Sequence, residues 1–220
     1  MRVCLASTSP ARLMLLRQAG IEPITMSPDV DEDAVAAAAA VATGAELAPA
    51  ELVLLLARAK AADVAHRLAA AGEFDGIVIG GDSMFALHGR VYGKPHTAAE
   101  ATRRWQEMRG ATGVLHSGHS VFRVSPGADP VEATATAEAS VTFADDVSDQ
   151  ELAAYIASGE PLHVAGAFTV DSLGGPFITR VEGDPSTVVG MSLSTIRRLV
   201  ADLDVTWTDL WTPDLLPAAS

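Results

Sequence analysis

Residues 2–12 (RVCLASTSPAR) predict the first elements of the fold. Residues 2–6 are mostly apolar and run into two serines and a proline, so they predict a short buried strand followed by a helix. Proline suits the first position of a helix, because the N–H that it lacks would have no partner there. Residues 12–19 keep helical spacing, and Gly20 is a suitable end for that helix.

Further along the chain, helical and extended patterns alternate, and hairpins appear in the middle. Residues 85–91 resemble a hairpin that turns near His88 and Gly89. The predicted strands are residues 2–6, 21–27, 77–79, 113–124, 131–143 and 177–182, and the predicted helices are residues 12–19, 51–71, 97–109, 148–159 and one within 186–203. This order indicates the α/β class with a mixed sheet.

Length and composition favour one domain. We expect it over residues 1–205 of the 220, with a C-terminal tail at 206–220. Half of the residues are hydrophobic (49%), which suffices for a sizeable core. Residues 34–50 are rich in alanine without a clear pattern, and we interpret them as a surface helix or a flexible insert.

Charge and composition exclude several classes of function. The formal net charge is −13 and aromatic residues make up 5%, so nucleic acid and anionic membranes are not expected partners. No apolar run reaches the ~20 residues that span a bilayer, and the apolar stretch within residues 1–6 is too short for a signal peptide. A single cysteine, Cys4, excludes an internal disulfide. We therefore expect a cytoplasmic protein.

The turn between the first strand and helix is a candidate anion site. A helix N-terminus offers unpaired N–H groups and a favourable dipole to a phosphate. Ser7 and Ser9 add hydroxyl donors, and Arg12 can bind a phosphate through two hydrogen bonds. Taken alone, the same residues more often form an ordinary serine-capped helix.

Three other places carry residues suited to phosphate chemistry. Asp82 follows a β-branched run and two glycines, where a carboxylate could be a metal ligand, a general base or a simple turn residue. Lys94 lies between glycine and proline, and the acidic run at 31–33, which includes Glu32, could hold Mg²⁺ or merely be solvated. Judged only from the residues around it in the sequence, Lys60 would be a charged surface residue. No HExxH, GxSxG or P-loop pattern occurs.

Taken together and in this order, the motifs resemble the Maf family (septum formation protein Maf), which are nucleoside triphosphate pyrophosphatases. The matching motifs are LASTSPAR (5–12), DVDE (29–32), AKA (59–61), GGDS (80–83), GKP (93–95), GEP (159–161) with AGAF (165–168), and EGDP (182–185) through VVGMSL (188–193). They extend over most of the chain.

The resemblance implies an elongated α/β/α fold, similar to that of inosine triphosphatases, with a central mixed sheet and a deep cleft between two lobes, often as a homodimer. It also implies hydrolysis of canonical or modified (d)NTPs to the monophosphate and pyrophosphate, with Mg²⁺ or Mn²⁺ as cofactor.

The family's residue roles carry over to matching positions. Its catalytic proton acceptor falls on Asp82, and its acidic loop residue falls on Glu32. We expect these two to hold the metal and, with Lys94, to serve catalysis. The family's phosphate-binding residues fall on Ser7, Arg12, Lys60 and Lys94, to which we add Ser9.

Three positions separate the family's substrate classes. They hold Ala11, Ser83 and Asp171 here. Members acting on dTTP and UTP carry Arg, Thr and Gln at these positions, and members acting on 7-methyl-GTP carry an aromatic residue, Gln and Glu. Asp171 resembles the second class in charge, whereas Ala11 and Ser83 match neither, so the preferred base stays open.

Two alternatives to this function belong to different classes. A pyrophosphatase of the inosine triphosphate type would share the chemistry and prefer ITP or XTP. A nucleotide-binding regulator of cell division would bind without much catalysis, and the presence of Asp82, Glu32, Lys60 and Lys94 argues against it.

Overall fold

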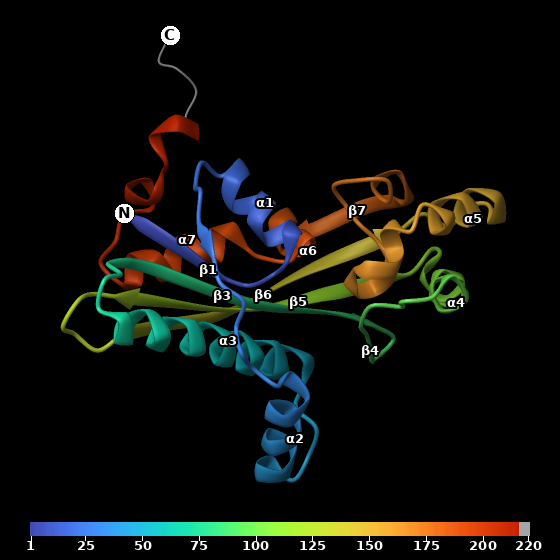
Figure 1. Ribbon diagram of the computed structural model, residues 1–220. Coiled ribbons are helices and arrows are strands. Elements are labelled where there is room, and N and C mark those ends of the chain that lie inside the picture. Colours follow the sequence, from blue (N-terminus) through green and yellow to red (C-terminus); the bar gives the residue numbers. More distant parts are fainter. Residues whose placement is uncertain (216–220) are drawn as a thin grey trace. The chain divides into compact units, whose positions relative to one another are not determined.

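The computed structural model describes residues 1–215 and contains a seven-stranded mixed sheet with helices on both faces (Figure 1). The strand order is β2-β1-β3-β5-β6-β7, with β4 paired to β3. The strands are β1 (Arg2–Ala6), β2 (Ile24–Thr25), β3 (Gly76–Leu87), β4 (Arg90–Tyr92), β5 (Thr112–Val124), β6 (Val131–Phe143) and β7 (Ile178–Gly183). β1 runs parallel to β2 and β3, whereas the β3–β4 and β6–β7 pairs are antiparallel. The predicted α/β class with a mixed sheet is confirmed.

The described part of the chain contains seven α-helices. They are α1 (Pro10–Gln18), α2 (Glu32–Thr43), α3 (Pro49–Ala71), α4 (Ala98–Met108), α5 (Asp149–Ala157), α6 (Pro185–Val189) and α7 (Leu193–Asp202). The predicted helix starts at Thr97 and Ser148 are confirmed, because each side chain accepts a hydrogen bond from the backbone three residues on. Within residues 1–215 no helix is long and apolar enough to cross a membrane.

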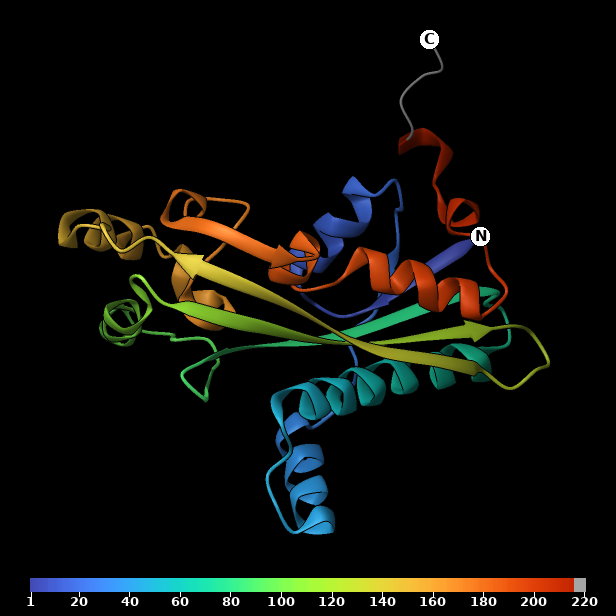
Figure 2. The same ribbon diagram turned by 180° about the vertical axis from the view of Figure 1, so that it is seen from behind.

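The chain folds as two compact units. The first contains Met1–Asp82, Ser117–Ala137 and the chain from Gly190 onward. In this unit α3 covers one face of the sheet, and α1 and α7 cover the other (Figures 1 and 2). Apolar residues of β1, β3 and β5, among them Cys4, Val78 and Phe122, pack with Val64 of α3 into a buried cluster.

Glycines in the strands allow α3 to approach the sheet closely. A Cβ at Gly80 would lie 2.6 Å from the Cβ of Ala61 and 2.8 Å from the carbonyl oxygen of Ala57. A Cβ at Gly118 would lie 2.2 Å from the carbonyl oxygen of Val53. The sequence suggested that the strand ends at Gly80–Asp82, but β3 continues to Leu87. Gly80 therefore serves helix packing and not a turn.

The second unit contains Ser83–His116 and Glu138–Val189. Its core is aromatic: the ring of Trp105 on α4 packs edge-on against Phe143, Tyr155 and Phe177. The indole Nε1 of Trp105 donates a hydrogen bond of 2.8 Å to the carbonyl oxygen of Ala167. This contact ties α4 to the glycine-containing loop after α5.

Several elements differ from the sequence prediction. The predicted strand at 21–27 is only the two-residue β2. The predicted helix within 186–203 is in fact two, α6 and α7. Residues 34–50 belong largely to α2, a surface helix without a buried residue.

The predicted tail at 206–220 is described only as far as Leu215. It contains two short 3₁₀ helices, Trp207–Leu210 and Pro213–Leu215. The N–H of Thr212 donates to the carbonyl oxygen of Gly20 at 2.8 Å. Leu210 is buried, so this part of the tail packs within the first unit, to which it belongs. Residues 216–220 lie outside the described part.

Candidate active site

The turn between β1 and α1 folds around the hydroxyl group of Ser7. Its Oγ accepts hydrogen bonds from the N–H of Ser9 at 3.1 Å and from Nη1 of Arg12 at 3.3 Å. The side chain of Ser9 caps α1 by accepting from the N–H of Arg12 at 3.4 Å, and Pro10 begins the helix. The serine-capped start predicted from the sequence is confirmed, and it places the guanidinium of Arg12 against Ser7.

Arg12 is also held by a second contact. Its Nε donates a hydrogen bond of 2.9 Å to the carbonyl oxygen of Gly190. Burial lowers the pKa of this guanidinium, and the nearby carboxylates of Asp82 and Glu32 raise it. Arginine nevertheless keeps its proton in proteins, so Arg12 presents a permanent and well-oriented cation.

Lys60 joins two carboxylates that come from different elements. Its Nζ lies 2.7 Å from Oδ1 of Asp82 on β3 and 2.9 Å from Oε2 of Glu32, the first residue of α2. Lys60 and Asp82 are each only 8% exposed, whereas half of the Glu32 side chain is exposed. The close packing of α3 on Gly80 brings the ammonium to this depth.

Asp82 has the electrostatic character of a group that can exchange a proton. Burial raises the pKa of its carboxyl group above the ordinary value, and Glu32 adds to this effect. Lys60 and Arg12 act in the opposite direction. A carboxylate with a raised pKa is a stronger base, as general-base catalysis near neutral pH requires.

The register of the parallel strands explains why these residues meet. Ala6 of β1 pairs with Gly80 of β3. Ser7, the residue after β1, and Asp82, two residues beyond Gly80, therefore lie at the same end of β1. Ligands of α/β proteins commonly bind at the carboxyl ends of parallel strands.

The structure thus brings six of the sequence-predicted residues together in the first unit: Ser7, Ser9, Arg12, Glu32, Lys60 and Asp82. Ala11 lies in α1 beside them, half-buried. The other three, Ser83, Lys94 and Asp171, belong to the second unit. Lys94 is exposed in the turn after β4, and Asp171 is exposed in a loop after α5. The roles assigned to all these residues stay predictions.

The loop that carries Asp171 is organised by a residue that sequence reasoning did not single out. The carboxylate of Glu160 accepts hydrogen bonds from the hydroxyls of Thr169 (2.5 Å) and Ser172 (2.7 Å). It also accepts from the backbone N–H groups of Leu173 and Gly174. The only sequence signal was the position of Glu160 in the GEP motif.

The residues of the first unit are suited to a divalent metal. Mg²⁺ is usually held by one or two carboxylates together with substrate phosphates and water. Asp82 and Glu32 supply two carboxylates, which lie close enough to share one ammonium. No group of three or more His, Cys, Asp or Glu side chains suited to a metal occurs among residues 1–215. The donor set therefore fits a metal that is shared with phosphate oxygens, not a closed structural site.

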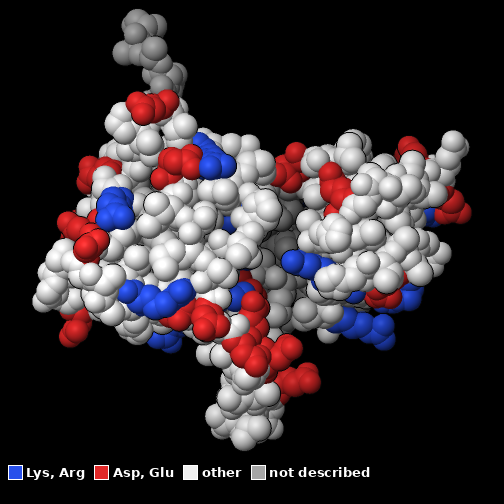
Figure 3. Space-filling model, in the orientation of Figure 1, with Lys and Arg blue, Asp and Glu red and all other residues white. Residues whose placement is uncertain are grey.

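The outer surface near Glu32 is acidic. Asp29 and Asp31, which precede α2, and Asp33 in its first turn are exposed. Figure 3 shows acidic side chains gathered where this helix begins. This surface attracts cations from solution, and it would repel a polyanion that approached without one.

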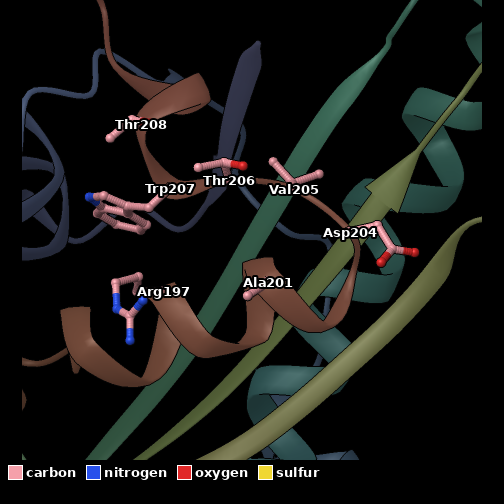
Figure 4. A pocket seen from close by; sticks show the side chains of 7 residues that line it. All are labelled: Arg197, Ala201, Asp204, Val205, Thr206, Trp207 and Thr208. Carbon is pink, nitrogen blue, oxygen red and sulfur yellow. The ribbon is translucent and has the colours of Figure 1, made fainter.

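A hollow of about 470 Å³ lies elsewhere in the first unit, between α7 and the segment after it (Figure 4). It is lined by Arg197, Ala201, Asp204, Val205, Thr206, Trp207 and Thr208. Its charged and hydroxyl-bearing residues are all exposed, and none of the predicted site residues lines it. The hollow therefore lacks the buried charged groups found around Asp82.

Comparisons with known proteins agree with the motifs. A nucleoside triphosphate pyrophosphatase of Leifsonia xyli subsp. xyli is 59% identical over 96% of this chain and 97% of its own. Proteins of the same name from Rhodococcus jostii and Salinispora tropica are each 50% identical, over 94% and 96% of this chain and 94% and 88% of their own. The family model for Maf-like protein matches residues 2–203. The chain therefore belongs to the Maf family.

Proposed function

We propose that the protein hydrolyses nucleoside triphosphates to the monophosphate and pyrophosphate, by attack of water on the α-phosphorus. The carrying observation is the buried Lys60, which bridges Asp82 and Glu32 beside the paired Ser7 and Arg12. The names of relatives at 50–59% identity support the same reaction.

Asp82 would orient the attacking water and accept its proton. The raised pKa of its carboxyl group suits this role. The short ion pair to Lys60 fixes one carboxylate oxygen and leaves the second available to the water. Glu32 approaches the same ammonium from the more exposed side, so it would face the incoming phosphates.

Ser7, Arg12 and Lys60 would bind the phosphate oxygens. An ammonium has three N–H donors; that of Lys60 donates a hydrogen bond to Asp82 and forms an ion pair with Glu32, so a donor is left for a phosphate. The hydroxyl of Ser7 accepts two hydrogen bonds and keeps its own proton to donate. Fixed donors of this kind stabilise the charge that develops on the leaving pyrophosphate.

The charge balance of the site supports a metal cofactor. Arg12 and Lys60 are balanced by Asp82 and Glu32, so a bound triphosphate would add uncompensated negative charge. We propose that Mg²⁺ or Mn²⁺ is held by Asp82 and Glu32 against the substrate. When bound, the metal would neutralise part of the phosphate charge and polarise the phosphoryl oxygens.

A regulator that binds nucleotide without turnover is less consistent with this arrangement. Binding alone requires cations and hydroxyl donors, which Ser7, Arg12 and Lys60 supply. It does not require a buried carboxylate of raised pKa, which costs stability and serves proton transfer. Asp82 therefore favours catalysis.

The test is pyrophosphate release from a panel of canonical and modified nucleoside triphosphates with Mg²⁺ or Mn²⁺. Asp82→Asn should lower kcat by roughly 10²–10⁴ while the protein stays folded. Asp149→Asn is the matched control, because Asp149 is exposed on α5 and, within residues 1–215, forms an ion pair with Arg109 alone. Turnover near wild type in Asp82→Asn would refute the base assignment. Absence of product from every nucleotide would refute the activity.

A further inference from the structure

His119 on β5 is completely buried and plays no part in the mechanism above. Its Nε2 lies 2.9 Å from the backbone nitrogen of Ser192. A backbone N–H can only donate, so Nε2 must be the acceptor and carry no proton. The ring is therefore the neutral tautomer with its proton on Nδ1. A neutral, oriented imidazole in the core thus acts as a fixed acceptor.

The segment that His119 holds is the one that orients Arg12. Gly190, two residues before Ser192, offers its carbonyl oxygen to Nε of Arg12 at 2.9 Å. Ser192 also caps α7, because its Oγ accepts from the N–H of Thr195 at 3.2 Å. Residues 190–192 are thus fixed by hydrogen bonds to β5, α1 and α7, and His119 supplies the contact from the sheet.

We propose that His119 is a positioning residue for polyphosphate binding, which acts through residues 190–192 to set the direction of the Arg12 guanidinium. Nε of Arg12 bonds to Gly190, and Nη1 bonds to Ser7. Two such contacts fix the plane of the guanidinium, and a planar fork binds phosphate well only in a defined orientation. This inference rests on the proposed function, because Arg12 must bind phosphate for its orientation to matter.

Packing alone does not explain a histidine at position 119. Burying a polar ring costs free energy unless it is hydrogen-bonded, and an aliphatic side chain would fill the same place without that cost. What the histidine adds is an acceptor for the N–H of Ser192, which would otherwise be buried without this partner. The role assigned here requires that acceptor and no proton transfer.

The experiment compares His119→Leu, which removes the acceptor, with His119→Gln, whose amide oxygen can replace it. Binding of inorganic pyrophosphate is measured by calorimetry, and KM and kcat are measured with a nucleoside triphosphate. We expect His119→Leu to weaken pyrophosphate binding and raise KM about ten- to a hundredfold, the scale of a lost hydrogen bond to a charged group, with a smaller change in kcat. His119→Gln should recover most of the binding.

Ser120→Ala is the control for loss of a buried hydrogen bond at the neighbouring position of β5, where the hydroxyl donates to Glu132. It should lower the thermal midpoint without changing pyrophosphate affinity. If His119→Leu and Ser120→Ala reduce affinity equally, or if His119→Gln gives no recovery, the positioning role is refuted.

A double-mutant cycle with Arg12→Gln separates the positioning role of His119 from the phosphate-binding role of Arg12. If His119 acts through Arg12, His119→Leu should change affinity little once Arg12 has been replaced. Additive effects would overturn the inference. Unchanged affinity in Arg12→Gln alone would instead overturn the phosphate-binding role in the proposed function.

If His119→Leu fails to fold, NMR of the ¹⁵N-histidine-labelled wild-type protein still tests the proposal. Nε2 of His119 must appear unprotonated, and the amide proton of Ser192 must show the shift of a strong hydrogen bond. A proton on Nε2 would refute the proposal.

Discussion

The close approach of α3 to β3 can be tested by replacing Gly80 with alanine. The added Cβ would lie 2.6 Å from the Cβ of Ala61, against 3.4 Å for ordinary contact, a shortfall of 0.8 Å. It would also lie 2.8 Å from the backbone oxygen of Ala57, so rotating a side chain cannot relieve the clash. The helix must move away from the strand, and Lys60 must move with it because it precedes Ala61.

The expected consequence is a loss of activity together with a loss of stability. Overpacking a core costs typically 1–3 kcal/mol, and each kcal/mol lowers the thermal midpoint by about 2–4 °C in a domain of this size. A shift of the order of 1 Å in a catalytic group can reduce turnover about a hundredfold. We therefore expect kcat/KM of Gly80→Ala to fall about a hundredfold as the 2.7 Å contact between Lys60 and Asp82 lengthens.

Pyrophosphate release and thermal unfolding should be measured together, with Gly72→Ala as the matched control. Gly72 ends α3 with a positive φ of 74°, so alanine is strained there, but its Cβ meets nothing within 4 Å. This variant should lose about 1 kcal/mol of stability and keep its activity. If Gly80→Ala loses stability but keeps wild-type kcat/KM, the close approach of α3 serves packing alone.

Three further predictions concern the proton, the base and the metal. The acid limb of the pH profile of kcat/KM should lie above the ordinary range of an aspartate, because activity is lost as pH falls through the raised pKa of Asp82. Lys60→Met should move this limb to higher pH, because the ammonium lowers the pKa of Asp82. A limb that did not move would show that Lys60 does not affect the titrating group. Asp171→Gln should change the ratio of GTP to UTP turnover, and Glu160→Gln should change it in the same direction by loosening the loop; a constant ratio in both variants would remove this loop from base selection. Removal of divalent metal by a chelator should abolish turnover, and added Mg²⁺ or Mn²⁺ should restore it, whereas full activity in excess chelator would contradict the metal proposal.

Local patterns were enough to predict the start of the fold. The β1–α1 turn was predictable because Pro10, the serine cap and the apolar run before them act within a few residues. The end of β3 was predicted wrongly, because two glycines usually indicate a turn. Whether a glycine serves a turn or a close helix contact depends on residues about twenty positions away, such as Ala57 and Ala61.

The candidate site shows the same limit. Family motifs indicated Asp82, Lys60 and Glu32, but by its own pattern Lys60 would be a surface charge. Its burial follows from the packing of α3, which no short motif encodes. His119 could not be assigned from the sequence either, because its partner is a backbone N–H 73 residues away.

The position of Glu32 at the start of α2 has a consequence for local stability. No residue of α2 is buried, so little apolar surface holds this helix in place, and its opening should require much less free energy than global unfolding. The amides of α2 should exchange with solvent deuterium long before those of β1 and β3. The carboxylate that bonds Lys60 from the outer side is therefore carried by one of the least protected parts of the first unit. A ligand that fixed Glu32 in place would slow the hydrogen exchange of amides throughout α2.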